Sequence, residues 1–203
     1  MDTTGEKPRK GPRTRAAILD EATRLATLEG LEGLSIGGLA AAIGMSKSGL
    51  YAHFGSKEEL QLATIQAARE IFVAEVLTPA LAAPKGVERL HAACEAFLSH
   101  VERHVFPGGC FFAAAAAEVG TRPGPVRDQI ATHQRAWLGL LERLALEATE
   151  LGQLPIDTDG AQLAFELNAV LVAANTSFIL QGDPAAFHRA RDAVRERLRL
   201  QRD

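Results

Sequence analysis

The sequence is poor in the residues and motifs that carry catalysis, metal binding and disulfide cross-linking. Its 203 residues include only two cysteines, Cys94 and Cys110, which lack a CxxC spacing and therefore indicate neither a zinc site nor a disulfide framework. A reducing, cytoplasmic compartment fits this composition. No nucleophile elbow, glycine-rich phosphate loop or paired-carboxylate arrangement is present either. We therefore expect a protein that is not an enzyme and that needs no cofactor.

Long hydrophobic runs and a strong excess of one charge are also missing. The most apolar stretches, "CFFAAAAAEV" and "AVLVAANTSFIL", are short or broken by polar residues, so we expect no membrane span. No apolar segment of the signal-peptide type follows the basic "KPRKGPRTR". The formal net charge is -3, yet the first fifteen residues hold five basic and two acidic side chains. This local excess is compatible with an anionic partner and equally with a solvated tail.

A helical period runs through almost the whole chain, and no strand-like alternation or internal repeat interrupts it. The pattern predicts an all-α fold of roughly nine helices. Thr14, Ser35, Ser46 and Ser56 are candidate N-caps, because a side-chain oxygen at that position accepts from a free backbone N–H. Later helices are expected over 56–78 and 85–104, in the apolar "GGCFFAAAAAEVG", from Pro125 to about 151, and after Asp159 and Asp183.

The stretch "IGMSKSGLYAHFGSKEEL" predicts a helix-turn-helix. Short helices over 35–43 and 47–53 are joined by a turn that contains glycine. Leu50 and Phe54 would face the core. The opposite face of this helix would then carry small side chains, which allow its backbone to approach the floor of a DNA groove closely. Lys47 at the first turn could reach a phosphate or a guanine edge, and Tyr51 would stand on the flank where backbone contacts are made.

"LSIGGLAAAIGMSKSGLYAHFGSKEEL" resembles the N-terminal signature of TetR-family transcriptional regulators over roughly 14–62, and "GGCFFAAAAAEVGTRPGPVRD" resembles a segment of one branch of that family. The resemblance implies a homodimer with an N-terminal DNA-binding domain and a helical C-terminal domain that binds a small inducer. The pair Gly37-Gly38 departs from the family pattern. Each glycine costs a helix about 1 kcal/mol relative to alanine, so the second helix is expected to be less stable.

We therefore assign 1–56 to a DNA-binding helix-turn-helix domain, with a basic arm over 1–13, and 57–203 to an effector-binding and dimerisation domain. The resemblance implies DNA contacts at Ser35, Lys47, Tyr51, His53 and Lys57. Together with the small residues of the recognition helix, the predicted DNA-binding set is Ser35, Ser46, Lys47, Ser48, Gly49, Tyr51, His53 and Lys57.

Two stripes of apolar residues at helical spacing near the C-terminus suggest a dimer interface of four helices. Its predicted residues are Leu167, Leu171, Ala174, Phe178, Val194 and Leu198. The alternative is that both stripes face only the core of their own chain. Aromatic and polar residues of several helices suggest an apolar effector pocket, although such residues are more often plain core. The predicted pocket residues are Phe97, Phe111, Phe112, Trp137, Leu141, Phe165 and Asn168.

The sequence thus predicts a ligand-responsive repressor that binds a pseudo-palindromic double-stranded DNA operator as a homodimer. A small apolar effector would release it. Two alternatives stay open: a helical dimeric interaction module without DNA binding, and a redox- or metal-responsive regulator. For the second, Cys94 and Cys110 are the candidate redox groups, and His100 with His104 the candidate metal pair.

Overall fold

The computed structural model describes residues 10–200, with side chains from Thr14 onward. This part of the chain holds ten α-helices and one π-helical segment and no strand, which confirms the all-α prediction. In chain order the elements are α1 (Lys10–Glu29), α2 (Ile36–Ala42), α3 (Lys47–Phe54), α4 (Lys57–Phe72), η1 (Val73–Leu77), α5 (Thr78–Ala82), α6 (Val87–Glu102), α7 (Phe111–Val119), α8 (Pro125–Glu150), α9 (Gly160–Gln181) and α10 (Ala185–Arg197).

The elements α4, η1 and α5 follow one another without a break, and counted as one helix they bring the total in the described part to nine. The sequence predicts a stop before Pro79, but the helix passes this residue. A π-helical register replaces the ordinary one at η1, and the Thr78 hydroxyl donates to the Val73 carbonyl oxygen at 2.9 Å. In an ordinary helical turn the proline ring clashes with the carbonyl group four residues earlier, and the wider π-helical turn gives this ring more room.

Three of the four predicted N-caps are present. The hydroxyl oxygens of Ser35, Ser46 and Ser56 accept from the third residue of the helix that follows, at 3.0, 3.1 and 3.0 Å. The prediction for Thr14 is wrong, because α1 begins at Lys10. Pro12 falls in the first turn of α1, where a missing N–H costs no helical hydrogen bond.

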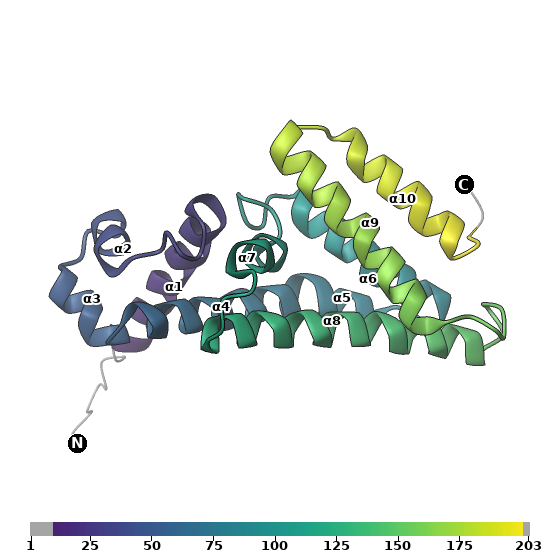
Figure 1. Ribbon diagram of the computed structural model, residues 1–203, viewed down its shortest axis with the longest axis horizontal. Helices are drawn as coiled ribbons and strands as arrows, with labels where there is room; N and C mark the ends of the chain where they lie inside the picture. Colours follow the sequence, from purple (N-terminus) through teal and green to yellow (C-terminus); the bar gives the residue numbers. More distant parts are fainter. Residues whose placement is uncertain (1–9, 201–203) are drawn as a thin grey trace, which may run out of the picture.

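The helices build an elongated body (Figure 1). The helices α1, α2 and α3 gather at one end, and α8 runs along most of the molecule beside the rod formed by α4, η1 and α5. The helices α9 and α10 lie together towards the other end. The helix α1 packs against α2, α4 and α7, whereas α9 packs against α6, α8 and α10. The helices α4 and α7 therefore join the two ends of the body.

Among the described residues, α9 is the one helix long and apolar enough to cross a membrane by length and composition. Its apolar residues lie on two faces. Leu163 and Leu167 are buried against neighbouring helices, whereas Phe165 and Leu180 are 63% and 79% exposed. One face of α9 therefore belongs to the core of the same chain, whereas its apolar outer face is uncovered.

The structure contradicts the predicted dimer interface at five of its six residues. These five are buried in the chain's own core, with at most 4% exposure: Leu167, Leu171, Ala174, Val194 and Leu198. The reason is that the stripe of α9 meets the stripe of α10 within one chain. The sixth residue, Phe178, is half-buried and packs on Phe187 with ring centroids 4.7 Å apart. A second copy of the chain cannot reach side chains that are already covered.

Candidate functional site

The helices α2 and α3 form a tight helix-turn-helix. Gly44 adopts a positive φ of 67°, and the Met45 N–H donates to the Ala40 carbonyl oxygen at 2.9 Å, which closes the turn. Leu50 and Phe54 are buried beneath α3, with 0% and 3% exposure. The turn thus fixes α3 against the body of the protein with its opposite face in solvent.

The exposed face of α3 carries most of the predicted DNA-contacting residues. Lys47, Ser48 and Ala52 are exposed, and the Tyr51 side chain is 56% exposed, an unusual position for a large aromatic residue. The N-cap Ser35 and Ser46 are exposed as well, whereas the predicted residues Gly49 and His53 are half-buried. The structure brings these eight residues, seven of them from the predicted set, to one end of the molecule around the start and outer side of α3.

Gly37 makes room for Lys47. A Cβ atom at Gly37 would lie 3.1 Å from Cε of Lys47, so the aliphatic stem of the lysine passes across α2. A Cβ atom at Gly38 would likewise lie 3.1 Å from the Ser35 hydroxyl oxygen, which accepts the N–H of Gly38. The glycine pair that departs from the family pattern therefore lets α2 lie close to the side chains of Lys47 and Ser35.

Lys57 is directed to the α1–α2 loop. Its ammonium group donates to the Glu32 carbonyl oxygen at 2.5 Å and lies 3.5 Å from the Glu32 carboxylate. The side chain is still 46% exposed. A phosphate contact from Lys57 would have to compete with both oxygens of Glu32, so this residue suits DNA binding less well than Lys47 does.

The helix α7 reaches the same loop from the other side. The Glu118 carboxylate accepts from the backbone N–H groups of Leu31 and Glu32, both at 2.7 Å. The N-terminal end of α7 lies in the aromatic centre of the larger domain, because Phe112 contacts Phe72 with ring centroids 6.0 Å apart. A single short helix thus connects that centre to the backbone just before α2.

The predicted effector pocket is a packed aromatic cluster around Phe72, a residue that sequence reasoning did not select. The ring of Phe72 makes edge-to-face contacts with Phe97, Phe112 and Trp137 at centroid distances of 5.4–6.4 Å. The indole N–H of Trp137 donates to the Asn168 amide oxygen at 3.1 Å. The space left between these side chains is only about 10 Å³. This is about the space that a single water molecule needs, so the cluster has no room for an organic effector.

Three residues of the predicted pocket do not line that space. Phe165 is wrong for a pocket because it lies on the outer face of α9 with 63% exposure. Phe111 and Leu141 are buried elsewhere in the core, with 2% and 0% exposure. Helical spacing alone does not separate the inner from the outer face when both faces of a helix are apolar, as in α9.

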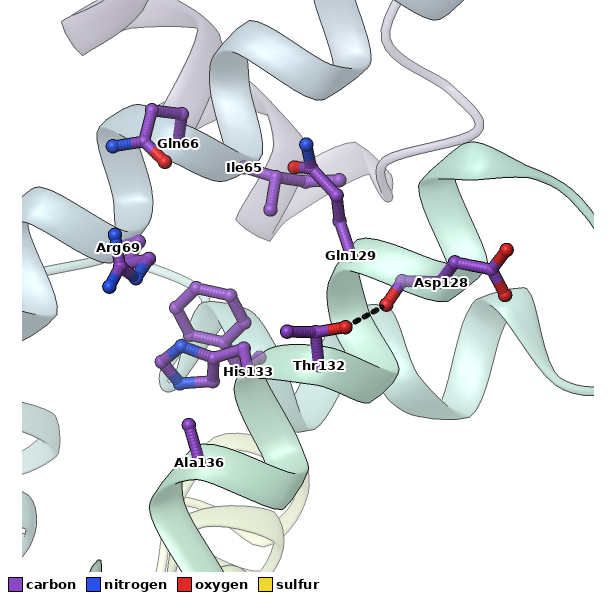
Figure 2. A pocket seen from close by; sticks show the side chains of 9 residues that line it. Ile65, Gln66, Arg69, Asp128, Gln129, Thr132, His133 and Ala136 are labelled. Atoms are coloured by element: carbon purple, nitrogen blue, oxygen red, sulfur yellow. Dashed lines mark hydrogen bonds between the residues drawn. The ribbon is translucent and has the colours of Figure 1, made fainter.

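An open cleft lies beside the aromatic cluster, between α4 and α8 (Figure 2). Its volume is about 380 Å³. Figure 2 shows Arg69 and Gln66 on α4 facing His133 and Gln129 on α8, with the carboxylate of Asp128 directed away from the arginine. This first cleft is lined by Ile65, Gln66, Arg69, Phe112, Asp128, Gln129, Thr132, His133 and Ala136.

A second cleft of about 230 Å³ adjoins the first, and Arg69, His133 and Ala136 line both. Its walls are mainly apolar. Val73 and Leu81 on the α4–α5 rod are 37% and 48% exposed here. The other residues of its lining are Phe72, Leu77, Trp137, Leu140 and Arg143. The first cleft thus carries more polar side chains than the second, and the two meet at Arg69, His133 and Ala136.

His133 forms the wall between the cluster and the clefts. Its ring stacks on Phe112 with a centroid distance of 3.3 Å and meets Phe72 edge-on at 5.0 Å. Burial lowers the pKa of His133 to about 4, and the positive charge of Arg69 acts in the same direction. The imidazole is therefore neutral at physiological pH and can donate or accept a hydrogen bond.

The candidate sensing residues do not suit a thiol or metal switch. Burial raises the pKa of the Cys94 thiol to about 12 and also raises that of Cys110, so neither forms the reactive thiolate readily. His100 is fully buried, whereas His104 is exposed and packs on Phe178. Within residues 10–200, no group of three His, Cys, Asp or Glu side chains is arranged to hold a metal ion.

The residues of the clefts are the functional candidates that sequence reasoning missed. Arg69 and Arg143 appear in the sequence as ordinary charged residues on exposed helix faces, and His133 has no motif around it. Their partnership depends on α4 packing against α8, which no local pattern predicts. The π-helical segment beside them, which widens the helix at Val73, is a feature often found at functional sites.

Two family models match the chain. The model described as bacterial regulatory proteins of the tetR family matches residues 18–64, and the one described as the tetracyclin repressor-like C-terminal domain matches residues 86–194. The comparison with curated protein sequences finds no match.

Solved structures of the same family resemble the protein over nearly its whole length. A TetR transcriptional regulator from Chloroflexus aurantiacus has a TM-score of 0.88 at 25% identity and covers 96% of this chain and 98% of its own. The regulator AibR, in complex with isovaleryl coenzyme A and operator DNA, has a TM-score of 0.70 at 26% identity, with 89% and 95% covered. A cysteine mutant of the regulator CifR, complexed with operator DNA, has a TM-score of 0.75 at 26% identity, with 95% and 98% covered.

Proposed function

This chain belongs to the TetR family of transcriptional regulators, and we propose that it is a homodimeric repressor released from its operator by a small molecule bound in the C-terminal domain. The single observation that carries this proposal is the exposed face of α3, where small side chains lie beside the solvent-exposed Lys47 and Tyr51. Structures of AibR and CifR with operator DNA support it. Residues 1–56 are the proposed DNA-binding domain, and 57–203 the proposed effector and dimerisation domain of a cytoplasmic protein.

The proposed DNA contacts are of two kinds, those on the floor of the major groove and those to the phosphates at its edges. Small side chains at Ser48 and Gly49 allow α3 to approach the floor of a major groove, where base edges are read. Lys47, Tyr51 and the exposed Ser46 would bind the phosphates on either side, which sets the position of the helix on the duplex. His53 stands at the edge of this face, and Lys57 would contribute only after it leaves Glu32.

The proposed dimer interface is the outer face of α9, in place of the buried stripes. Phe165 and Leu180 are large and exposed on this face, and Ala169, Ala173 and Thr176 lie between them at helical spacing. Small residues in the middle of the face allow two copies of α9 to approach closely. Apolar surface of this kind is costly in water and typical of an obligate contact. Two-fold pairing would present two α3 helices to DNA.

The proposed release depends on two conformations of the dimer. An effector in the clefts between α4 and α8 would favour the conformation whose two α3 helices no longer match successive major grooves, about 34–36 Å apart. The effector acts only if it binds that conformation more tightly than the DNA-bound one. Because Phe112 lines the first cleft and belongs to α7, a shift of α7 would reach the α1–α2 loop through Glu118.

Selection from a pool of random DNA duplexes tests the proposal. The protein should enrich a sequence with two-fold symmetry and half-sites about one helical turn apart. A variant with Lys47→Ala and Tyr51→Ala should enrich nothing, while its circular dichroism spectrum and dimer mass stay unchanged. Recovery of no shared sequence by a folded dimer would instead favour the alternative of a helical interaction module without DNA binding.

A further inference from the structure

The two clefts between α4 and α8 differ in chemistry, and this difference narrows the class of molecule that they can bind. The first cleft, of about 380 Å³, holds the polar side chains of Gln66, Gln129 and Thr132. The second, of about 230 Å³, is walled by apolar side chains such as Val73 and Leu81. A volume of several hundred cubic ångströms is the range of small-molecule sites.

The junction of the clefts is positively charged. Arg69 lines both clefts and Arg143 lines the second. Among the hydrogen bonds and ion pairs of residues 14–200, neither guanidinium takes part in one, whereas Arg89, Arg103 and Arg191 each pair with a glutamate. The side chains of Arg69 and Arg143 are both exposed, and an arginine that lines a cleft without a carboxylate partner can bind an anion through its guanidinium.

The one acidic residue of the lining does not neutralise Arg69. The carboxylate of Asp128 pairs with the Arg127 guanidinium at 3.2 Å and points away from Arg69 in Figure 2. The neighbouring imidazole of His133 is neutral at physiological pH, so it does not repel the Arg69 guanidinium. A neutral ring at this place can donate one further hydrogen bond to a bound oxygen.

The second cleft exposes side chains that would be better covered. Val73 is 37% exposed and Leu81 is 48% exposed, and both belong to the rod in which the π-helical segment η1 displaces the ordinary helical register. Phe72, Leu140 and Trp137 complete the walls. Covering such a surface with an alkyl chain is favourable in proportion to the apolar area removed from water.

We propose that the clefts bind an amphipathic organic anion, with its acidic head between Arg69 and His133 and its alkyl tail in the cleft formed by Val73, Leu81 and Trp137. The prediction that the effector is simply apolar is thereby narrowed to a molecule with a charged end. The inference rests on the proposed function only for the claim that this ligand is the effector; the binding itself is independent of DNA.

Four ligands that share a ten-carbon chain separate the possibilities: decanoate, decyl phosphate, decanol and decyltrimethylammonium. Trp137 is the only tryptophan of the chain and lines the second cleft, so its fluorescence reports occupancy directly. Below the micelle concentration, an anion should bind at least tenfold more tightly than decanol, and the cation should not bind. Decanoate against decyl phosphate shows whether the head is a planar carboxylate or a tetrahedral phosphate.

Variants then assign the contacts. Arg69→Ala and Arg69→Gln should each weaken binding of the preferred anion about tenfold or more and leave decanol binding unchanged. Arg189→Ala is the matched control, since this exposed arginine lies on α10, away from both clefts. Shortening the chain from ten carbons to eight should weaken binding roughly fourfold for each methylene removed.

Equal affinity for decanol and the anions, preference for the cation, no binding of any anion, or unchanged anion affinity in both Arg69 variants would each overturn the inference. Operator affinity in the presence of the bound anion is a separate measurement. An anion that binds as described and leaves operator affinity unchanged would uphold the ligand class and contradict the effector-release part of the proposed function.

Discussion

The carboxylate of Glu118 on α7 holds the backbone of Leu31 at the start of the loop that leads into α2. It accepts the N–H groups of Leu31 and Glu32 at 2.7 Å each, and Gly30 supplies the positive φ of 85° that turns both donors toward it. A Cβ atom at Gly30 would lie 2.7 Å from an oxygen of Glu118, so the approach requires glycine. The larger domain thereby sets the position of the loop before the helix-turn-helix.

Replacement of Glu118 by alanine should lower the free energy of unfolding by about 1–3 kcal/mol, because two partly buried backbone donors lose a charged acceptor. Glu118→Gln should cost less, since its single amide oxygen still accepts. Chemical denaturation measures both values. Glu150→Ala, an exposed glutamate at the end of α8, serves as the control and should change the free energy by less than about 0.5 kcal/mol. Equal losses in Glu118→Ala and Glu150→Ala would contradict a structural role for this contact.

The stability of the protein should depend on pH through His100. This side chain is fully buried between Phe72 and Phe106, both ring nitrogens lack a hydrogen-bond partner within the described residues, and burial lowers its pKa to about 4. A depressed histidine pKa means that the unfolded chain binds more protons between the two pKa values. The stability linked to His100 is therefore fully present above pH 6.5 and falls as the pH drops towards 4, by on the order of 3 kcal/mol.

His100→Leu removes both the protonation site and the two unpaired nitrogens. We expect a higher melting temperature than wild type at pH 7 and a smaller loss of stability between pH 7 and pH 4.5, measured by thermal unfolding at both values. His133 retains its own pH dependence in this variant, because its pKa is also about 4. A variant with an unchanged pH profile would show that His100 is not a source of the acid sensitivity.

The outer face of α9 should control the oligomeric state. Leu180→Glu combined with Phe165→Glu places charge on two side chains that are 79% and 63% exposed, so the monomer should keep its fold while the dimer dissociates. Analytical ultracentrifugation gives the mass. Leu28→Glu is the matched control, because Leu28 is 53% exposed on α1, outside this face. A double variant that remains as dimeric as the control would rule out α9 as the interface.

Gly37→Ala should separate helix stability from DNA affinity. Alanine raises the helix propensity of α2 by up to about 1 kcal/mol, yet its Cβ would lie 3.1 Å from Cε of Lys47 and push that stem aside. The lysine is exposed and can move, so thermal unfolding should show equal or higher stability. Operator affinity should fall because Lys47 is displaced. A variant with unchanged affinity would show that the position of Lys47 across α2 does not matter for DNA binding.

Local signals explain which features of the fold the sequence predicts well. The caps Ser35, Ser46 and Ser56 act on N–H groups three residues away, and Gly44 acts within its own turn, so the short helices near the N-terminus follow from local chemistry. The same holds for Pro125 at the first position of α8. The sequence did not predict that the helix continues past Pro79, because no local pattern indicates the π-helical register at η1.

The clefts and the exposed apolar face of α9 could not be predicted from local sequence patterns. Arg69 and His133 come together only because α4 packs on α8, and Leu167 is covered because the stripe of α9 meets α10 of the same chain. An apolar stripe in the sequence predicts that one face of a helix is buried. It does not indicate whether the same chain or a second copy of the chain buries that face. Phe165 and Leu180 reveal the other face once the first has been assigned.

The dependence of operator affinity on salt concentration, measured for Lys47→Ala against Lys85→Ala, tests the central claim most directly. Lys85 is an exposed lysine beside Glu147, before α6, so it controls for the loss of one charge. If α3 binds the DNA backbone through Lys47, fluorescence anisotropy should show weaker operator binding by Lys47→Ala. The slope of log affinity against log salt concentration should also become shallower, by about 1 for each protomer that carries the substitution. Lys85→Ala should keep the wild-type affinity and slope. Identical affinities and salt slopes for the two variants and the wild type would contradict the account.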